Sequence, residues 1–249
     1  MRTISAVLAA LLLALSGCGG SDDDTLTVSA AASLKKALTQ YGGEFEAATA
    51  RFSFAGSDEL AAQIRKGAKP DVFASANTKL PDELYKEGLV EKPVTFAGNR
   101  LVLAVPAEGS DVASLKDVER AGTTLAIGSE TVPVGSYTRA VLAKLPESES
   151  SKILKNVRSE EPDVAGIVGK LTQGAVDAGF VYISDVRATD GKLKAIELPD
   201  TLQPTVAYSA AVVKGTGHED AAKAFIDGLL DGDGKAALDA AGFEPPPAQ

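Results

Sequence analysis

The chain has 249 residues, of which 45% are hydrophobic and 24% are charged, and its formal net charge at neutral pH is −9. This length is sufficient for two lobes of ordinary domain size. An acidic chain lacks the basic patches that bind nucleic acid, so we exclude nucleic acid as a partner. Any anion site must therefore depend on local dipoles rather than on long-range attraction.

Residues 1–17 have the features of an export signal. Arg2 precedes an apolar run, residues 6–15, which is too short to span a bilayer as a mature helix. The run ends in Leu15-Ser16-Gly17-Cys18, which resembles the lipobox of bacterial lipoproteins. We therefore expect Cys18 to be the first mature residue and to carry lipid on the outer face of the cytoplasmic membrane. Residues 18–24 predict a flexible tether, and a single cysteine excludes an internal disulfide.

The rest of the chain alternates predicted strands with predicted helices. Short runs rich in Val, Ile, Leu and Phe predict strands at residues 26–29, 51–54, 72–74, 101–105, 124–127, 178–182 and 206–213. Helical spacing of apolar residues predicts helices at residues 34–48, 58–66, 81–87, 134–145, 163–173 and 219–230. This alternation is typical of an α/β fold with mainly parallel sheets.

The first strand and helix have the features of an anion site. The strand runs through three consecutive alanines, residues 30–32, into a helix for which Ser33 is the first candidate cap. A helix N-terminus offers unpaired N–H groups and partial positive charge, and small side chains let a ligand approach them. Taken alone, this stretch favours the simpler interpretation, in which Ser33 is only the cap.

Four further places could begin helices that face the same cleft. In two of them a proline precedes the predicted helix. Pro133 is followed by Gly135, whose lack of a side chain would leave the backbone accessible, and Pro162 is followed by Asp163, which could cap the helix. The others are Ser57 after Gly56, and Tyr182, whose hydroxyl could donate at the end of a strand. Each signal is common in α/β proteins, and the neighbouring Ser184 and Asp185 suit caps better than ligands.

The order of these motifs resembles that of the molybdate-binding proteins that serve bacterial ABC importers. Residues 30–34 resemble the opening motif of that family, and Ser57 followed by residues 60–76 resembles its most recognisable segment. Residues 132–137 and 181–185 follow in the expected order, so that the resemblance runs from about Thr27 to Phe243.

The resemblance implies a two-lobed periplasmic-binding-protein fold of type II, with a two-strand hinge and a ligand cleft between the lobes. Residues 25–100 and 206–249 would form lobe 1, and residues 101–205 would form lobe 2. Each lobe would be a mainly parallel sheet flanked by helices. The resemblance further implies a monomer whose partner is the permease of an ABC importer, and which has no cofactor and no catalytic residues.

The resemblance also implies that hydrogen-bond donors alone hold the ligand, without direct metal ligands. They are the hydroxyls of Ser33, Ser57 and Tyr182 and the backbone N–H groups of Ser33, Ser57, Val134 and Val164. Many members of the family have a serine where this chain has Asp58. A carboxylate there would repel a dianion unless it turned away.

A site made only of donors suits molybdate, a deprotonated dianion with four acceptor oxygens. Hydrogen phosphate carries a proton that would find no acceptor, and a buried polar group without a partner costs about 1–3 kcal/mol. Tungstate is nearly the same size as molybdate and should bind as well, whereas sulfate is smaller. The choice of molybdate over sulfate rests on the family resemblance.

Three alternatives remain. One is a receptor for another oxyanion such as sulfate, and another is an adhesin without a small ligand. The third is a secreted serine hydrolase with Ser33 or Ser57 as nucleophile. That alternative is weak because the only histidine, His218, suits a surface helix cap, and no G-x-S-x-G elbow precedes a helix. No cluster of His and Cys suggests a metal enzyme.

Overall fold

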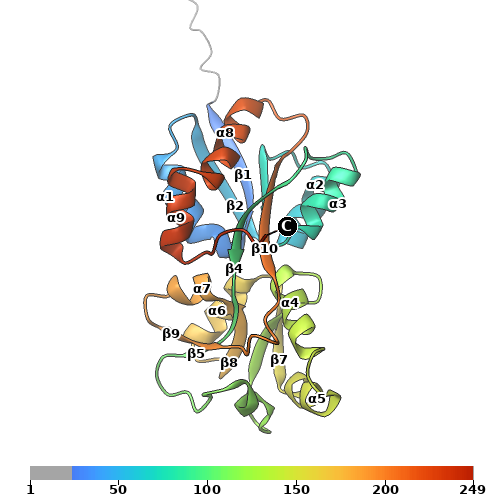
Figure 1. Cartoon of the computed structure of the whole chain (residues 1–249), viewed down its shortest axis with the longest axis vertical. Coiled ribbons are helices and arrows are strands. Elements are labelled where there is room, and N and C mark those ends of the chain that lie inside the picture. The colour runs from blue at the N-terminus through green and yellow to red at the C-terminus, as the bar shows by residue number, and fades with distance from the viewer. Residues whose placement is uncertain (1–23, 249) are drawn as a thin grey trace, which may run out of the picture.

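The computed structural model describes residues 24–248, in which two lobes are stacked along the long axis of the molecule (Figure 1). Each lobe is built on a five-stranded sheet, and helices lie on the flanks of the sheets. This architecture confirms the predicted α/β class. The predicted signal segment, Cys18 and nearly all of the predicted tether lie outside the described residues.

Lobe 1 is defined here by the sheet with strand order β2-β1-β3-β10-β4. Its strands are β1 (Thr25–Ala31), β2 (Thr49–Ala55), β3 (Val72–Ser75), β4 (Val94–Asn99) and β10 (Val206–Val212). A 3₁₀ turn, η1 (Ala32–Leu34), joins β1 to α1. The helices of lobe 1 are α1 (Lys35–Glu44), α2 (Ser57–Arg65), α3 (Lys79–Lys86), α8 (Glu219–Leu230) and α9 (Asp233–Ala241). Figure 1 shows α1, α8 and α9 on one side of the sheet and α2 and α3 on the other.

Lobe 2 is defined by the sheet with strand order β7-β6-β8-β5-β9. Its strands are β5 (Leu101–Pro106), β6 (Leu125–Gly128), β7 (Val157–Glu161), β8 (Ala178–Tyr182) and β9 (Leu193–Glu197). Its helices are η2 (Leu115–Glu119), α4 (Pro133–Leu142), α5 (Glu147–Lys155), α6 (Val164–Thr172) and α7 (Ile183–Arg187). Between residues 24 and 248, no helix combines the length and the apolar character needed to cross a bilayer.

The strand directions agree with the expectation of mainly parallel sheets. Four of the five strands in each sheet run in one direction, and only β10 in lobe 1 and β5 in lobe 2 run antiparallel to their neighbours. One expectation needs correction: the first helix ends at Glu44 instead of continuing to residue 48, and β2 already begins at Thr49. The glycine pair at residues 42–43 weakens the last turn of this helix, because glycine has a low helix propensity.

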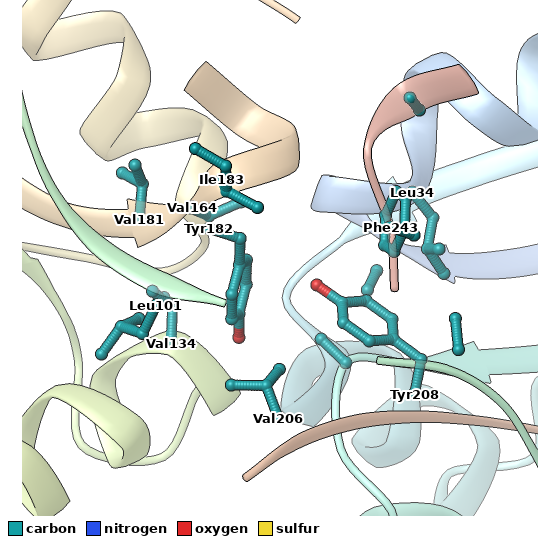
Figure 2. Packing of buried hydrophobic residues seen from close by; sticks show 14 of the residues in the cluster. Leu34, Leu101, Val134, Val164, Val181, Tyr182, Ile183, Val206, Tyr208 and Phe243 are labelled. Atoms are coloured by element: carbon teal, nitrogen blue, oxygen red, sulfur yellow. The ribbon is translucent and has the colours of Figure 1, made fainter. Parts of the chain in front are cut away.

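The chain passes between the two sheets twice. β4 ends at Asn99 and β5 begins at Leu101, and the chain returns between the end of β9 at Glu197 and the start of β10 at Val206. Close to these crossings, buried apolar side chains of both lobes belong to one continuous cluster, which includes Tyr182 and Tyr208 (Figure 2). The crossings and this packing bring the inner ends of both sheets together.

Candidate functional site

A pocket of about 230 Å³ lies between the two lobes. It is lined by segments that follow β1, β2 and β3 in lobe 1 and β6, β7 and β8 in lobe 2. These are the carboxyl ends of the three strands of each sheet that pair with one another in parallel, and open α/β sheets bind their ligands at such ends. The lining residues are Ala31, Ala32, Ser33, Ala55, Gly56, Ser57, Ala76, Val132, Pro133, Val134, Asp163, Val164 and Tyr182.

All five residues predicted as ligands lie in this lining: Ser33, Ser57, Val134, Val164 and Tyr182. They come from five different strand-to-helix connections, three of them in lobe 2 and two in lobe 1. The structure therefore brings together residues that are up to about 150 positions apart in the sequence, and it does so at the meeting point of the lobes.

Ser33 is not a helix cap. It lies within η1, whose N-terminal cap position is Ala31, and α1 is preceded by Leu34 at its own cap position. Neither helix start has a side-chain cap hydrogen bond. The Ser33 hydroxyl is instead 2.9 Å from the Tyr208 hydroxyl. The interpretation of Ser33 as only a cap is therefore wrong, because a 3₁₀ turn carries the chain past Ser33 before the α-helix begins.

Ser57 is the first residue of α2, and Gly56 occupies the cap position. Its buried hydroxyl oxygen accepts a hydrogen bond of 3.1 Å from the backbone N–H of Ala76, at the end of β3. Because a hydroxyl group has one hydrogen to donate, the hydrogen of Ser57 stays available to a ligand. The adjacent backbone N–H groups belong to the first turn of a helix and have no partner within that helix.

Lobe 2 presents two helix N-termini to the pocket. Val134 is the second residue of α4, after Pro133 at the helix start, and Val164 is the first residue of α6. Asp163 caps α6 as predicted, because its carboxylate accepts a 3.0 Å hydrogen bond from Gly166 N–H. This bond engages Oδ1 of the carboxylate that lines the pocket.

Gly135 has a different role from the one expected. A side chain at this position would collide with the backbone of Gly128 and Ser129. The absence of a side chain therefore allows α4 to pack closely on the end of β6, and it does not serve to expose the backbone of the helix.

Tyr182 ends β8, and its ring is almost completely buried. Its hydroxyl has no hydrogen-bond partner among the described residues. Burial raises the pKa of this hydroxyl well above its usual value, and the nearby Tyr208, Tyr137 and Asp185 raise it further. The group therefore stays protonated at neutral pH and can act as a donor. The Tyr182 and Tyr208 rings are in edge-to-face contact, with ring centroids 5.8 Å apart, and Figure 2 shows them beside each other.

Asp58 is turned away from the pocket lining. Its Oδ2 accepts a hydrogen bond of 2.6 Å from the Thr131 hydroxyl, on the loop before α4 of lobe 2. The lobes are in close contact nearby, since a side chain on Gly56 would collide with the carbonyl oxygen of Pro162. Sequence reasoning did not find Thr131, because no local pattern links a loop threonine to a residue more than seventy positions earlier.

Asp185 and Ser184 differ in their roles at the start of α7. Asp185 accepts a 3.0 Å hydrogen bond from Tyr182 N–H, as expected of a cap. Burial raises the pKa of this carboxyl to about 7, and the charge of Asp163 adds to the increase. Ser184 was also expected to cap, but its hydroxyl oxygen accepts a 2.8 Å hydrogen bond from the Asn99 side chain.

His218 is distant from the pocket lining. It precedes α8, where its side chain makes no cap bond, and its Nδ1 lies 3.2 Å from the carboxylate of Asp71. Neither Ser33 nor Ser57 therefore has a histidine beside it. Over residues 24–248, no group of three or more His, Cys, Asp or Glu side chains could hold a metal ion.

Comparison with known proteins shows similarity along nearly the whole chain. The family model described as bacterial extracellular solute-binding protein matches residues 26–244. The molybdate-binding protein ModA of Mycobacterium tuberculosis is 35% identical over 228 residues, covering 89% of this chain and 85% of that protein. The putative ABC transporter substrate-binding lipoprotein YvgL of Bacillus subtilis is 31% identical and covers 96% of both chains.

A solved structure agrees with the fold described above. The periplasmic molybdate-binding protein of Azotobacter vinelandii superposes with a TM-score of 0.80 and 24% sequence identity, covering 89% of this chain and 100% of that one. The likeness supports the two-lobed α/β architecture in which the pocket lies between the sheets.

Proposed function

The chain belongs to the bacterial extracellular solute-binding proteins, and we propose that it binds molybdate or tungstate between its lobes and delivers it to an ABC importer. The names of its relatives support this ligand class, since several are molybdate-binding proteins. The relative YvgL is named as a component of an ABC transporter, which supports a permease as the partner.

The observation that carries the proposal is the chemistry of the pocket lining. None of the described residues that line the pocket is a lysine or an arginine, and Oδ1 of Asp163 accepts a hydrogen bond from its own helix. The hydrogen-bond donors that face a ligand are the hydroxyls of Ser33, Ser57 and Tyr182, together with first-turn N–H groups. In this proposal they satisfy the four acceptor oxygens of a tetrahedral dianion, aided by the partial positive charge at the helix N-termini.

The same lining explains why hydrogen phosphate would be rejected. Hydrogen phosphate would need an acceptor for its proton, and a buried polar group without a partner costs about 1–3 kcal/mol, or more for a charged group. Because Tyr182 is held protonated by burial, it cannot provide that acceptor by losing its own proton. Only a fully deprotonated oxyanion makes good bonds with every group.

Because the donors come from both lobes, the ligand would favour the closed arrangement. A ligand can shift an equilibrium between open and closed forms only through its different affinity for the two forms. Here the closed form alone would provide all donors at once. The importer would then distinguish the loaded protein by its closed shape.

We further assign this protein to the outer face of the cytoplasmic membrane, anchored through lipid on Cys18. The lipobox-like residues 15–18 and the polar segment after them support this assignment. The printed name of the B. subtilis relative, which includes the word lipoprotein, agrees with it.

A sulfate receptor is the second candidate, because sulfate has the same charge and the same lack of protons. A secreted serine hydrolase finds no support in the geometry. The partner of Ser33 is a tyrosine, and the partner of Ser57 is a backbone N–H group that cannot act as a base.

Thermal shift and calorimetric titration of the mature protein against molybdate, tungstate, sulfate and phosphate test the proposal. A ligand that binds only the native state stabilises it by RT ln(1 + [L]/Kd), so molybdate and tungstate should raise the Tm as their concentration rises. Phosphate should have no effect. A larger shift with sulfate would favour the second candidate, and no shift with any oxyanion would contradict the proposal.

A further inference from the structure

A chain of buried polar side chains leads from the hinge to the pocket. Asn99 lies at the end of β4, where the chain crosses to lobe 2, and its Nδ2 is 3.5 Å from the Tyr208 hydroxyl. The Tyr208 hydroxyl is in turn 2.9 Å from the hydroxyl of Ser33. All three side chains are buried, but only Ser33 lines the pocket.

The orientation of the Asn99 amide is fixed by its backbone neighbour. Its Oδ1 accepts a hydrogen bond of 2.9 Å from the backbone N–H of Arg100. The Nδ2 group must then face the other way, where it donates 2.8 Å to Ser184 and makes its longer contact with Tyr208. Nδ2 carries two hydrogens and has no acceptor capacity, so both contacts are donations by Asn99.

The contact between the two hydroxyls allows either of them to donate. Because the Tyr208 oxygen faces the N–H of Asn99, donation of its own hydrogen to the Ser33 oxygen is the favoured arrangement. Burial raises the pKa of Tyr208 well above its usual value, so this hydrogen is retained at neutral pH. The Ser33 oxygen then accepts from Tyr208, and the hydrogen of Ser33 remains for the pocket. The reverse order would leave the buried hydrogen of Tyr208 without an acceptor, which is costly.

We infer that Tyr208, itself oriented by Asn99, is a positioning residue that holds the Ser33 hydroxyl as a donor toward the bound oxyanion. The inference rests on the proposed function, because it assigns a direction to one donor of the proposed site. It assigns a role in ligand binding to residues that do not line the pocket.

A double-mutant cycle between Tyr208 and Ser33 tests this inference, because such a cycle isolates the coupling between two residues. Molybdate Kd is measured by calorimetry for the wild type, Tyr208→Phe, Ser33→Ala and the double variant. In the wild-type background, Tyr208→Phe should weaken binding about three- to tenfold, the usual worth of a hydrogen bond. In the Ser33→Ala background, Tyr208→Phe should leave the Kd unchanged, since the hydroxyl on which Tyr208 acts is gone.

Tyr41→Phe is the matched control. Tyr41 is also a buried tyrosine of lobe 1, but its hydroxyl donates to the carbonyl oxygen of Phe225 and does not line the pocket. Removing that hydroxyl should change the melting temperature without changing the Kd. Melting curves of the ligand-free proteins establish that each variant is folded.

The outcomes separate this inference from the proposed function. If the wild type binds neither molybdate nor tungstate, the proposed function itself fails. If the wild type binds, but Tyr208→Phe has no effect on Kd, the positioning role is overturned and the proposed function stands. If Tyr208→Phe weakens binding equally in both backgrounds, Tyr208 acts on the site by general packing, which also overturns the inference.

Discussion

The Thr131 hydroxyl of lobe 2 donates a hydrogen bond of 2.6 Å to the carboxylate of Asp58 in lobe 1. Asp58 is the second residue of α2, one position after Ser57, and Thr131 precedes α4 by two positions. The bond therefore joins the two helix starts that form opposite walls of the pocket. It engages Oδ2 of a carboxylate that does not line the pocket.

Thr131→Val should weaken molybdate binding by loosening the closed form. It removes one hydrogen bond to a charged acceptor, worth about 1.5–3 kcal/mol, and leaves the Asp58 carboxylate free to turn toward the ligand. We expect a Kd about tenfold or more higher by calorimetry. Thr124→Val is the matched control, because Thr124 makes a similar 2.7 Å bond to Asp177 within lobe 2. An equal loss of affinity in both variants would contradict a role in closure.

Ser33→Ala and Ser57→Ala should each weaken molybdate binding about tenfold to a hundredfold. A charge-assisted hydrogen bond is worth about 1.5–3 kcal/mol, and the helix N–H groups would still hold the anion. The first test is calorimetric titration of both variants, followed by melting curves without ligand. Ser33→Ala removes the hydroxyl partner of Tyr208, and Ser57→Ala leaves the Ala76 N–H without its acceptor, so the ligand-free melts should also fall. The Kd is therefore compared at a temperature at which each variant is folded. An unchanged Kd for either variant would remove that serine from the site.

Tyr182→Phe should weaken binding while leaving the ligand-free protein as stable as before, or more stable. The Tyr182 hydroxyl has no partner among the described residues, and an unsatisfied buried hydroxyl costs about 1–3 kcal/mol. Replacing it with hydrogen removes that cost together with one donor to the oxyanion. Measurement of the molybdate Kd and of the ligand-free Tm, for the wild type and Tyr182→Phe, distinguishes a ligand donor from a group that supports the fold. A lower Tm with an unchanged Kd would mean that the hydroxyl supports the fold and not the site.

Asp185→Asn should stabilise the protein at pH 8 but not at pH 4. The pKa of Asp185 is raised to about 7, so between pH 4 and pH 7 the folded state binds more protons than the unfolded state. The free energy of unfolding of the wild type therefore falls as pH rises through this range, by about 1–4 kcal/mol from this group.

Asparagine has no such titration and can still accept the hydrogen bond from Tyr182 N–H. Chemical denaturation of both proteins from pH 4 to pH 8 measures the difference. A constant difference between the two proteins across this range would mean that the carboxyl titrates normally.

Cys18→Ser should release the protein from membranes or stop its processing. The prediction follows from the lipobox-like sequence at residues 15–18, because the thiol would carry the lipid. Fractionation of host cells and mass spectrometry of the mature N-terminus measure the outcome. A processed wild-type protein found wholly in the soluble fraction would contradict lipid anchoring.

The sequence predicted all the inner strands of both sheets but only one of the four outer ones, β2. The three strands it missed, β4, β7 and β9, are all edge strands. An edge strand such as β7, Val-Arg-Ser-Glu-Glu, is only partly buried and has no continuous apolar run. Three helices were missed. α5 buries little besides Ile153, α7 is only five residues long, and α9 buries glycine and alanine apart from Leu238, which gives a weak apolar pattern. Periodicity detects an element only when one of its faces is buried along several turns.

The residues of the candidate site could be named from sequence because each lies in a local strand-to-helix motif, and because the order of these motifs resembles that of the molybdate-binding proteins. Their hydrogen-bond partners could not be named in this way. Tyr208, Ala76 and Thr131 reach Ser33, Ser57 and Asp58 only through the tertiary fold. The same reason explains the error about Ser33, because a cap and a ligand serine look identical until the 3₁₀ turn and the Tyr208 contact are known.

The position of β10 has a consequence for how the polypeptide acquires its structure. The lobe 2 sheet comes from one continuous stretch, residues 101–197, whereas the lobe 1 sheet needs β10 inserted between β3 and β4. Lobe 1 must therefore wait for the end of the chain, while lobe 2 can be completed earlier during synthesis. A chain truncated after residue 205 should yield a protease-resistant lobe 2 attached to a digestible N-terminal part. In the full chain, β10 is therefore the last strand to be synthesised, and it completes lobe 1, whose first strands are synthesised first.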